Sequence, residues 1–235
     1  REDFDQAESL FRQAHALDGA MARPLAGLAV VFTLQGMFRW AAPSTAFAEA
    51  AAHARAAVAL DPMDAQALSI LGGASAHQGK LDEALALALQ ATRLNPSGVS
   101  ACHVLAGVHL WRGEAAQGVA AAERAIRLSP NDPQLHLYLS IHSACLYGQR
   151  QYERAVEAAQ LATQRAPHYP LGWRGLANSL GHVGRIDEAR LALTRFLALV
   201  PGYTSEAVAR ETAPFRDEAE FQHYLEGLRN AGWAG

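Results

Sequence analysis

The segments Ala57-Val-Ala-Leu-Asp-Pro62, Ala91-Thr-Arg-Leu-Asn-Pro96 and Ala125-Ile-Arg-Leu-Ser-Pro130 repeat one short pattern at intervals of 34 residues. Pro167 and Pro201 are separated by the same interval. Proline lacks the backbone N–H that a helix needs and disfavours helical geometry in the residue before it, so each proline is expected to end a helix. A period of this length is typical of an array of stacked repeats.

Within each repeat, small residues recur at fixed distances from the proline. The positions are Leu71-Gly72, Gly79 and Ala84 in one repeat and Leu176-Ala177, Gly184 and Ala189 in another. A small residue after the leucine lets two helices cross closely, and glycine suits the left-handed cap that ends a first helix. The pattern resembles the tetratricopeptide repeat (TPR) over nearly the whole chain. This resemblance implies an all-α fold, a right-handed α-solenoid of TPR helix hairpins with C-terminal capping helices.

The repeat spacing predicts a TPR array over residues 1–201. It begins with a half repeat at 3–18 and continues with full repeats at 22–62, 64–96, 98–130, 132–167 and 169–201. The half repeat lacks its first helix, which suggests that the array was cut from a longer protein. Residues 202–235 are expected to form capping helices that cover the last apolar face. Asp217 is a candidate N-cap there, and Glu220 completes a capping-box pattern.

Composition agrees with helices and narrows the class of protein. Alanine, the strongest helix former, makes up 50 of the 235 residues. The formal net charge of −3 lacks the basic footprint of a nucleic-acid binder, so we expect no nucleic-acid partner. The longest uncharged stretch, Pro24–Phe38, is too short to span a bilayer. With no signal peptide and two cysteines in helical patterns, Cys102 and Cys145, the chain is expected to be soluble and cytoplasmic, without a membrane partner.

Three features give a narrower resemblance. They are a long loop with Phe38 and Trp40, the ending Pro201-Gly-Tyr-Thr204, and the closing Pro214-Phe-Arg-Asp217 followed by Tyr224-Leu-Glu-Gly-Leu-Arg-Asn-Ala-Gly232. Together they are similar to the C-terminal TPR regions of bacterial class III adenylate/guanylate cyclases and of winged-helix transcriptional regulators. The resemblance implies a sensing or partner-binding array whose catalytic or DNA-binding domain lies N-terminal to it.

In such an array the first helix of each hairpin lines the groove. The repeat register places ten candidate peptide-binding residues there: Gln66, Ser69, His77, His103, Trp111, Ser140, Tyr147, Arg174, Asn178 and His182. A groove with aromatic rings, histidines and one cation suits an extended or helical peptide; the alternative is an ordinary solvated surface. Arg174 and Asn178 also resemble half of the carboxylate clamp of chaperone-binding TPR proteins. The positions of the other half hold no matching residues, so we do not expect recognition of an acidic tail.

The first repeat carries about nine extra residues, Gly36–Ser44, between its helices. A loop with Phe38, Arg39 and Trp40 either packs on its own array, which we favour, or offers an apolar contact to another chain. A homodimer is one form that such a contact could take.

Ten histidines raise the question of a metal site. Zinc ligands on one helix usually stand four residues apart, and no two histidines here have that spacing. No nucleophile with a base, and no phosphate-cradling glycine loop, is recognisable. We therefore predict no catalytic residue, cofactor or metal, and a non-catalytic module that binds a protein or peptide as the regulatory or sensing part of a larger bacterial signalling protein. The alternatives are the regulatory tail of a nucleotide cyclase and a free-standing scaffold, which the half repeat disfavours.

Overall fold

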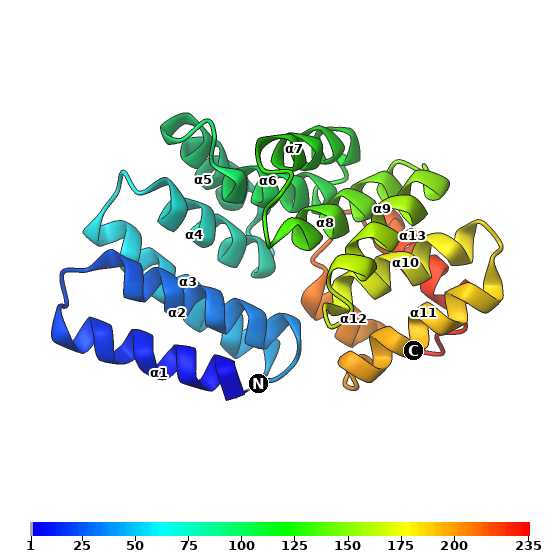
Figure 1. Ribbon diagram of the computed structural model, residues 1–235, viewed down its shortest axis with the longest axis horizontal. Helices are drawn as coiled ribbons and strands as arrows, with labels where there is room; N and C mark the ends of the chain where they lie inside the picture. The colour runs from blue at the N-terminus through cyan, green and yellow to red at the C-terminus, as the bar shows by residue number, and fades with distance from the viewer. Residues whose placement is uncertain (1) are drawn as a thin grey trace. The chain divides into compact units, whose positions relative to one another are not determined.

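A computed structural model describes residues 2–235, except for the side chain of Glu2. Over this range the chain forms thirteen α-helices and no strand, which confirms the all-α prediction (Figure 1). The helices are α1 (Glu2–Leu17), α2 (Ala22–Met37), α3 (Pro43–Leu60), α4 (Ala65–His77), α5 (Leu81–Leu94), α6 (Val99–Trp111), α7 (Ala115–Leu128), α8 (Leu135–Gly148), α9 (Tyr152–Arg165), α10 (Pro170–His182), α11 (Ile186–Leu199), α12 (Glu206–Thr212) and α13 (Glu218–Asn230).

The repeat prolines end helices as their chemistry requires. The helices α3, α5, α7, α9 and α11 each end two residues before one of them. Proline also stands in the first turn of α3 and of α10, at Pro43 and Pro170. At the start of α4 the Asp64 carboxylate accepts hydrogen bonds from the backbone N–H groups of Gln66 and Ala67.

A left-handed residue follows the first helix of every hairpin. Its φ is +76° at Gly79, +80° at Gly113 and +76° at Gly184, as the sequence predicts. Two further repeats hold arginine at this point, with φ +56° at Arg39 and +64° at Arg150. A residue with a Cβ is strained in this conformation by about 1–2 kcal/mol, so the two arginines are unexpected on backbone grounds.

The chain divides into two compact units, one up to Val104 and one from Leu105 onward. In the first unit α2 pairs with α3, α4 pairs with α5, and α1 packs on α2. Small residues allow these approaches, because a Cβ on Gly36 would come within 2.7 Å of the Phe47 ring. Alanines such as Ala29 and Ala54 are fully buried.

In the second unit α8 pairs with α9 and α10 with α11, and α13 packs on α10. Aromatic and leucine side chains from α10, α11 and α13 form one core, in which Leu180, Phe196, Phe221, Leu225 and Leu228 are buried. Together, α12 and α13 cover the apolar side of the last hairpin, which is the capping role expected of them.

The N-terminus of α13 differs from the predicted capping box. The Asp217 carboxylate accepts from the N–H groups of Ala219 and Glu220, as expected. The Glu220 carboxylate, however, accepts two hydrogen bonds from the guanidinium of Arg150, at 2.9 and 3.0 Å. The predicted capping box is therefore wrong at Glu220, since a bidentate pair with arginine is stronger than a bond to one N–H.

We predict that Gly113→Ala lowers the free energy of unfolding by about 1 kcal/mol, whereas Gly107→Ala raises it by about 0.5–1 kcal/mol. A Cβ on Gly113 would meet nothing within 4 Å, so its cost comes from φ alone. A Cβ on Gly107, inside α6, would contact Ile141 at an ordinary 3.8 Å. Urea titrations followed by circular dichroism would measure both. Equal destabilisation by the two substitutions would contradict the conformational explanation.

Candidate binding surface

The first helices of the second unit form one surface, which we call the A-face. It consists of residues 105–111 of α6 together with α8 and α10. The C-terminal segment, residues 213–233, lies against the A-face, and Figure 1 shows its helix α13 (red) beside α10. The surface predicted to bind a peptide thus already holds a helix of the same chain in this unit.

The C-terminal segment contacts three first helices in turn. The backbone N–H of Arg216 donates to the Trp111 carbonyl at the end of α6, at 2.7 Å. The Tyr147 hydroxyl on α8 donates to the His223 carbonyl, also at 2.7 Å. On α10, the guanidinium of Arg174 lies 5.4 Å from the centre of the Tyr224 ring, which is a cation–π contact.

The closest approach is at Gly227 in the middle of α13. A Cβ there would lie 2.6 Å from the Asn178 carbonyl oxygen and 2.7 Å from the Tyr147 hydroxyl. A Cβ on Gly181 of α10 would likewise collide with the Gly227 carbonyl. The two helices therefore cross in backbone contact, which only glycine permits at both positions.

Two histidines and two tyrosines gather at one side of this crossing. The His182 and Tyr152 rings stack with centroids 4.5 Å apart, and the His223 ring stacks on Tyr147 at 4.6 Å. The Tyr152 hydroxyl lies 2.9 Å from His223 Nε2. Burial, followed by the charge of Arg150, lowers the pKa of His223 to about 4. Burial also lowers the pKa of His182, so both rings are neutral near pH 7.

Four of the ten predicted groove residues are buried and do not offer an open surface: Ser69, Ser140, Tyr147 and Asn178. The two serines bond back to carbonyls of their own helices, at Ala65 and His136. Tyr147 and Asn178 are covered by α13. Repeat register fixes the face of a helix and not what covers it, so these four stay predicted groove residues although their side chains are buried.

The other groove residues of the second unit, Trp111, Arg174 and His182, are partly buried beside the C-terminal segment. In the first unit Gln66 is exposed, His77 stacks on Phe47 with centroids 4.5 Å apart, and burial lowers the pKa of His103 to about 4. Like the four buried residues, these six remain predicted ligand contacts.

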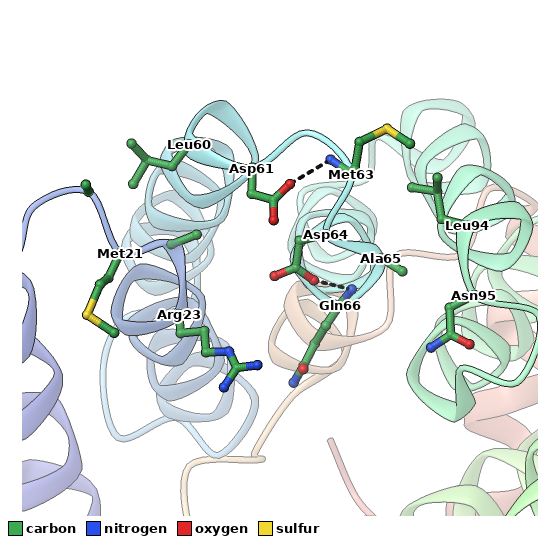
Figure 2. A pocket seen from close by; sticks show the side chains of 12 residues that line it. Met21, Arg23, Leu60, Asp61, Met63, Asp64, Ala65, Gln66, Leu94 and Asn95 are labelled. Carbon is green, nitrogen blue, oxygen red and sulfur yellow. Dashed lines mark hydrogen bonds between the residues drawn. The ribbon is translucent and has the colours of Figure 1, made fainter.

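Gln66 borders an open hollow of about 840 Å³ in the first unit (Figure 2). Its side chain and that of Arg23 point toward one another there, while the carboxylates of Asp61 and Asp64 accept hydrogen bonds from backbone N–H groups of their own turns. The lining residues are Ala20, Met21, Ala22, Arg23, Leu60, Asp61, Met63, Asp64, Ala65, Gln66, Leu94 and Asn95. The hollow is a shallow polar surface rather than an enclosed site.

The loop with Phe38, Arg39 and Trp40 contacts its own unit. The Trp40 ring meets the Phe38 ring at 5.2 Å and the Phe4 ring of α1 at 5.0 Å, both edge to face. These ring contacts pack the loop on its own unit, and a contact with another chain stays an untested alternative.

Among residues 2–235, no group of three or more histidine, cysteine or acidic side chains is placed to hold a metal ion. In the same range no helix combines the length and apolar character needed to cross a bilayer. Cys102 and Cys145 are buried, and burial raises the pKa of the Cys145 thiol.

Sequence reasoning gave Glu220 a different role and missed three other residues that hold the C-terminal segment, namely Arg150, His223 and Gly227. Two signals could have found some of them. Arg150 occupies a position where three other repeats have glycine, and Gly227 interrupts an otherwise favourable helix.

Comparison with known families identifies the repeat. A family model described as tetratricopeptide repeat matches residues 46–99 and 146–204. The chain is thus a TPR array. TPR scaffold proteins are typically not catalytic. Among curated protein sequences there is no significant match.

Solved structures share the fold at low sequence identity. The Cut9–Hcn1 APC/C hetero-tetramer aligns with a TM-score of 0.69 at 16% identity, covering 97% of this chain and 44% of that chain. The Pseudomonas aeruginosa PilF structure aligns with a TM-score of 0.56 at 23% identity, covering 96% of this chain and 90% of that chain. TTC0263, a TPR protein of Thermus thermophilus, aligns with a TM-score of 0.63 at 19% identity, covering 88% of this chain and 99% of that chain. The chain spans less than half of the Cut9–Hcn1 chain that it matches, and these likenesses concern the fold alone.

We predict that Gly227→Ala lowers the free energy of unfolding by about 1–3 kcal/mol, because α13 must move away from α10 to admit a methyl group. Urea unfolding of the full chain would measure it. As a control, Glu218→Ala on an exposed part of the same helix should change stability by no more than about 0.5 kcal/mol. A neutral Gly227→Ala variant would show that the crossing is looser than described.

We predict that acid weakens the packing of α13 through His223. The unfolded chain takes up this proton near pH 6.5, and the folded chain only near pH 4, so stability is present above pH 6.5 and is lost as pH falls toward 4. Because the ring is half-buried, we expect a loss of about 1–2 kcal/mol. Urea titrations at pH 7.0 and 4.5 should show a smaller loss for His223→Gln than for the wild-type chain. Identical losses would contradict this assignment.

Proposed function

We propose that the chain is a TPR module that binds a protein or peptide on the first helices of its repeats. The observation that carries this proposal is the docking of α13. The A-face holds that helix with a hydroxyl, a guanidinium and aromatic rings, which are the groups that recognise a helical segment in a groove. Tyr147 supplies the hydroxyl, Arg174 the cation–π contact and His182 a stacked ring, and all three belong to the predicted set.

The first unit supports the proposal in a different way. Of its predicted contacts Gln66, His77 and His103, Gln66 is exposed and borders the hollow of Figure 2. A ligand for this unit would meet polar and aromatic side chains on α4 and α6. We therefore propose the first helices of both units, each considered by itself, as binding surfaces.

Resemblance gives the wider context. The closing segments Pro214–Asp217 and Tyr224–Gly232 are similar to those of TPR regions in bacterial cyclases and winged-helix regulators. We propose on that basis that the module is the regulatory or sensing part of a larger cytoplasmic signalling protein. A nucleotide cyclase is one candidate for that parent, and its activity would reside outside this chain.

A selection from a displayed peptide library against the full chain tests the proposal. Peptides that bind the second unit should lose about tenfold in affinity with Trp111→Ala, and peptides that bind the first unit should lose about tenfold with Gln66→Ala, measured by fluorescence anisotropy. Arg127→Ala, an exposed change on a second helix, is the matched control and should leave the affinity unchanged. Failure to select any peptide would reject the function, and full affinity of both variants would reject the surfaces.

A further inference from the structure

We propose that residues 218–233, which follow the link at 213–217, are an exchangeable internal ligand of the A-face, and that the external partner is an amphipathic helix that displaces α13 from α8 and α10. This inference rests on the proposed binding function and specifies its partner and its regulation. Three observations support it: α13 packs on the first helix α10, buried atoms of Asn178 and His182 beside it lack hydrogen bonds, and Arg150 binds Glu220 of α13.

The position of α13 is unlike that of the helices within the array. Beyond their own hairpin partners, α4, α8 and α10 each pack most on the second helix of the preceding hairpin, namely α3, α7 and α9. In contrast, α13 packs mainly on the first helix α10 and only marginally on the second helix α11. It also reaches back to α8 through the Tyr147–His223 bond. The helix therefore lies where a groove ligand would lie rather than where the next repeat would continue.

Two buried side-chain atoms on α10 beside α13 have no hydrogen bond within the part of the chain that the structure describes. They are the side-chain oxygen of Asn178 and Nε2 of His182. Asn178 is only 3% exposed, and the carboxylate nearest to His182 Nε2, on Glu226, is 4.0 Å away. An unsatisfied buried group costs free energy that a better-matched ligand would not lose. The fit of α13 is thus incomplete at its centre, beside the Gly181–Gly227 crossing.

Arg150 ties α13 to the array at a strained position. Its φ of +64° is one that Gly79, Gly113 and Gly184 adopt without strain in other repeats. Its guanidinium binds both oxygens of Glu220 on α13. Strain of this kind persists where another interaction offsets it. The pair is partly exposed, with 43% of the Arg150 side chain accessible, so it can be broken without opening the core.

The link to α13 is suited to exchange. Residues 213–217 separate α12 from α13 and are not helical. A change in the backbone of this short link would swing α13 away and leave the hairpins of α8–α9 and α10–α11 in place. Short hinges of this kind are how one helix can leave its site for another.

The side chains by which α13 binds the A-face indicate which side chains a partner helix would need. Phe221, Leu225 and Leu228 of α13 are completely buried. Removal of α13 would therefore expose apolar surface on the A-face, unless another helix with equivalent apolar side chains takes its place. The contacts define a helix with an acid followed by an aromatic residue, an aromatic residue three positions later, and glycine three positions after that. A hydrogen-bond donor beside this glycine, which α13 lacks, would satisfy Asn178.

A labelled synthetic peptide of residues 213–235 provides the probe, and the full chain provides the receptor. In the Glu220→Arg chain the internal helix is repelled by Arg150 while the A-face is unchanged. We expect this chain to bind the wild-type peptide about tenfold more tightly than the wild-type chain does, measured by fluorescence anisotropy. A peptide carrying Glu220→Arg should lose that gain. The matched control is Glu218→Arg in the chain, on the same helix but paired with Arg210, and it should bind within about twofold of wild type.

The charge-swapped chain, Arg150→Glu with Glu220→Arg, restores the internal pair. With the Glu220→Arg peptide it should give the affinity that the wild-type chain has for the wild-type peptide, which separates loss of docking from loss of folding. Equal affinity of the wild-type and Glu220→Arg chains would overturn the proposal. A Glu220→Arg chain that sediments at twice 25.2 kDa would also overturn it, in favour of exchange between two copies. If library peptides bind the first unit while the peptide of residues 213–235 binds no variant, this inference fails and the proposed function stands.

Discussion

Close packing of helix backbones, made possible by alanine and glycine, is the constraint on which the other features depend. At the hairpin crossings a Cβ on Gly72 would lie 3.3 Å from the Ala84 carbonyl, and one on Gly118 would lie 3.1 Å from the Ala106 carbonyl. Most of the alanines on the buried faces, such as Ala122, are completely buried. Helices this close leave little room for side chains between them. The larger and the polar side chains therefore lie on the outer surfaces of each hairpin rather than between its two helices. The composition of the A-face is in this sense a consequence of the packing.

The same constraint governs the docking of α13. Its crossing with α10 uses glycine on both sides, at Gly181 and Gly227. The aromatic rings around it pack edge to face or stack on histidines, which adds directional contacts to the burial of Phe221. A helix held by backbone contact and ring geometry is specific in register, because a shift of one residue would place a side chain where only glycine fits. The ion pair of Arg150 with Glu220 then fixes the end of the helix that lies nearest the hinge.

The repeat architecture was predictable because its determinants are local. Proline stops a helix and glycine accepts a left-handed cap whatever the surroundings, so Pro62 and Gly184 could be interpreted from the sequence alone. The candidate site was only partly predictable. Register placed Tyr147 and Asn178 on a first helix correctly, but no local rule reveals that a segment much further along the chain covers them. Arg150 was missed for a related reason, since a local rule expects glycine there and a distant contact selects arginine.

A helix that completes a hydrophobic core and also occupies a binding surface connects stability with recognition. Phe221, Leu225 and Leu228 of α13 contribute to the same core as α10 and α11, so a partner that removes α13 must replace that buried area with its own. A short extended peptide cannot do so, whereas an amphipathic helix can. The free energy of docking α13 therefore sets a threshold that excludes weak or non-helical ligands. Because Asn178 and His182 each keep a buried atom without a hydrogen bond, α13 docks less favourably than a helix that bonded both atoms would. Such a helix could therefore displace α13.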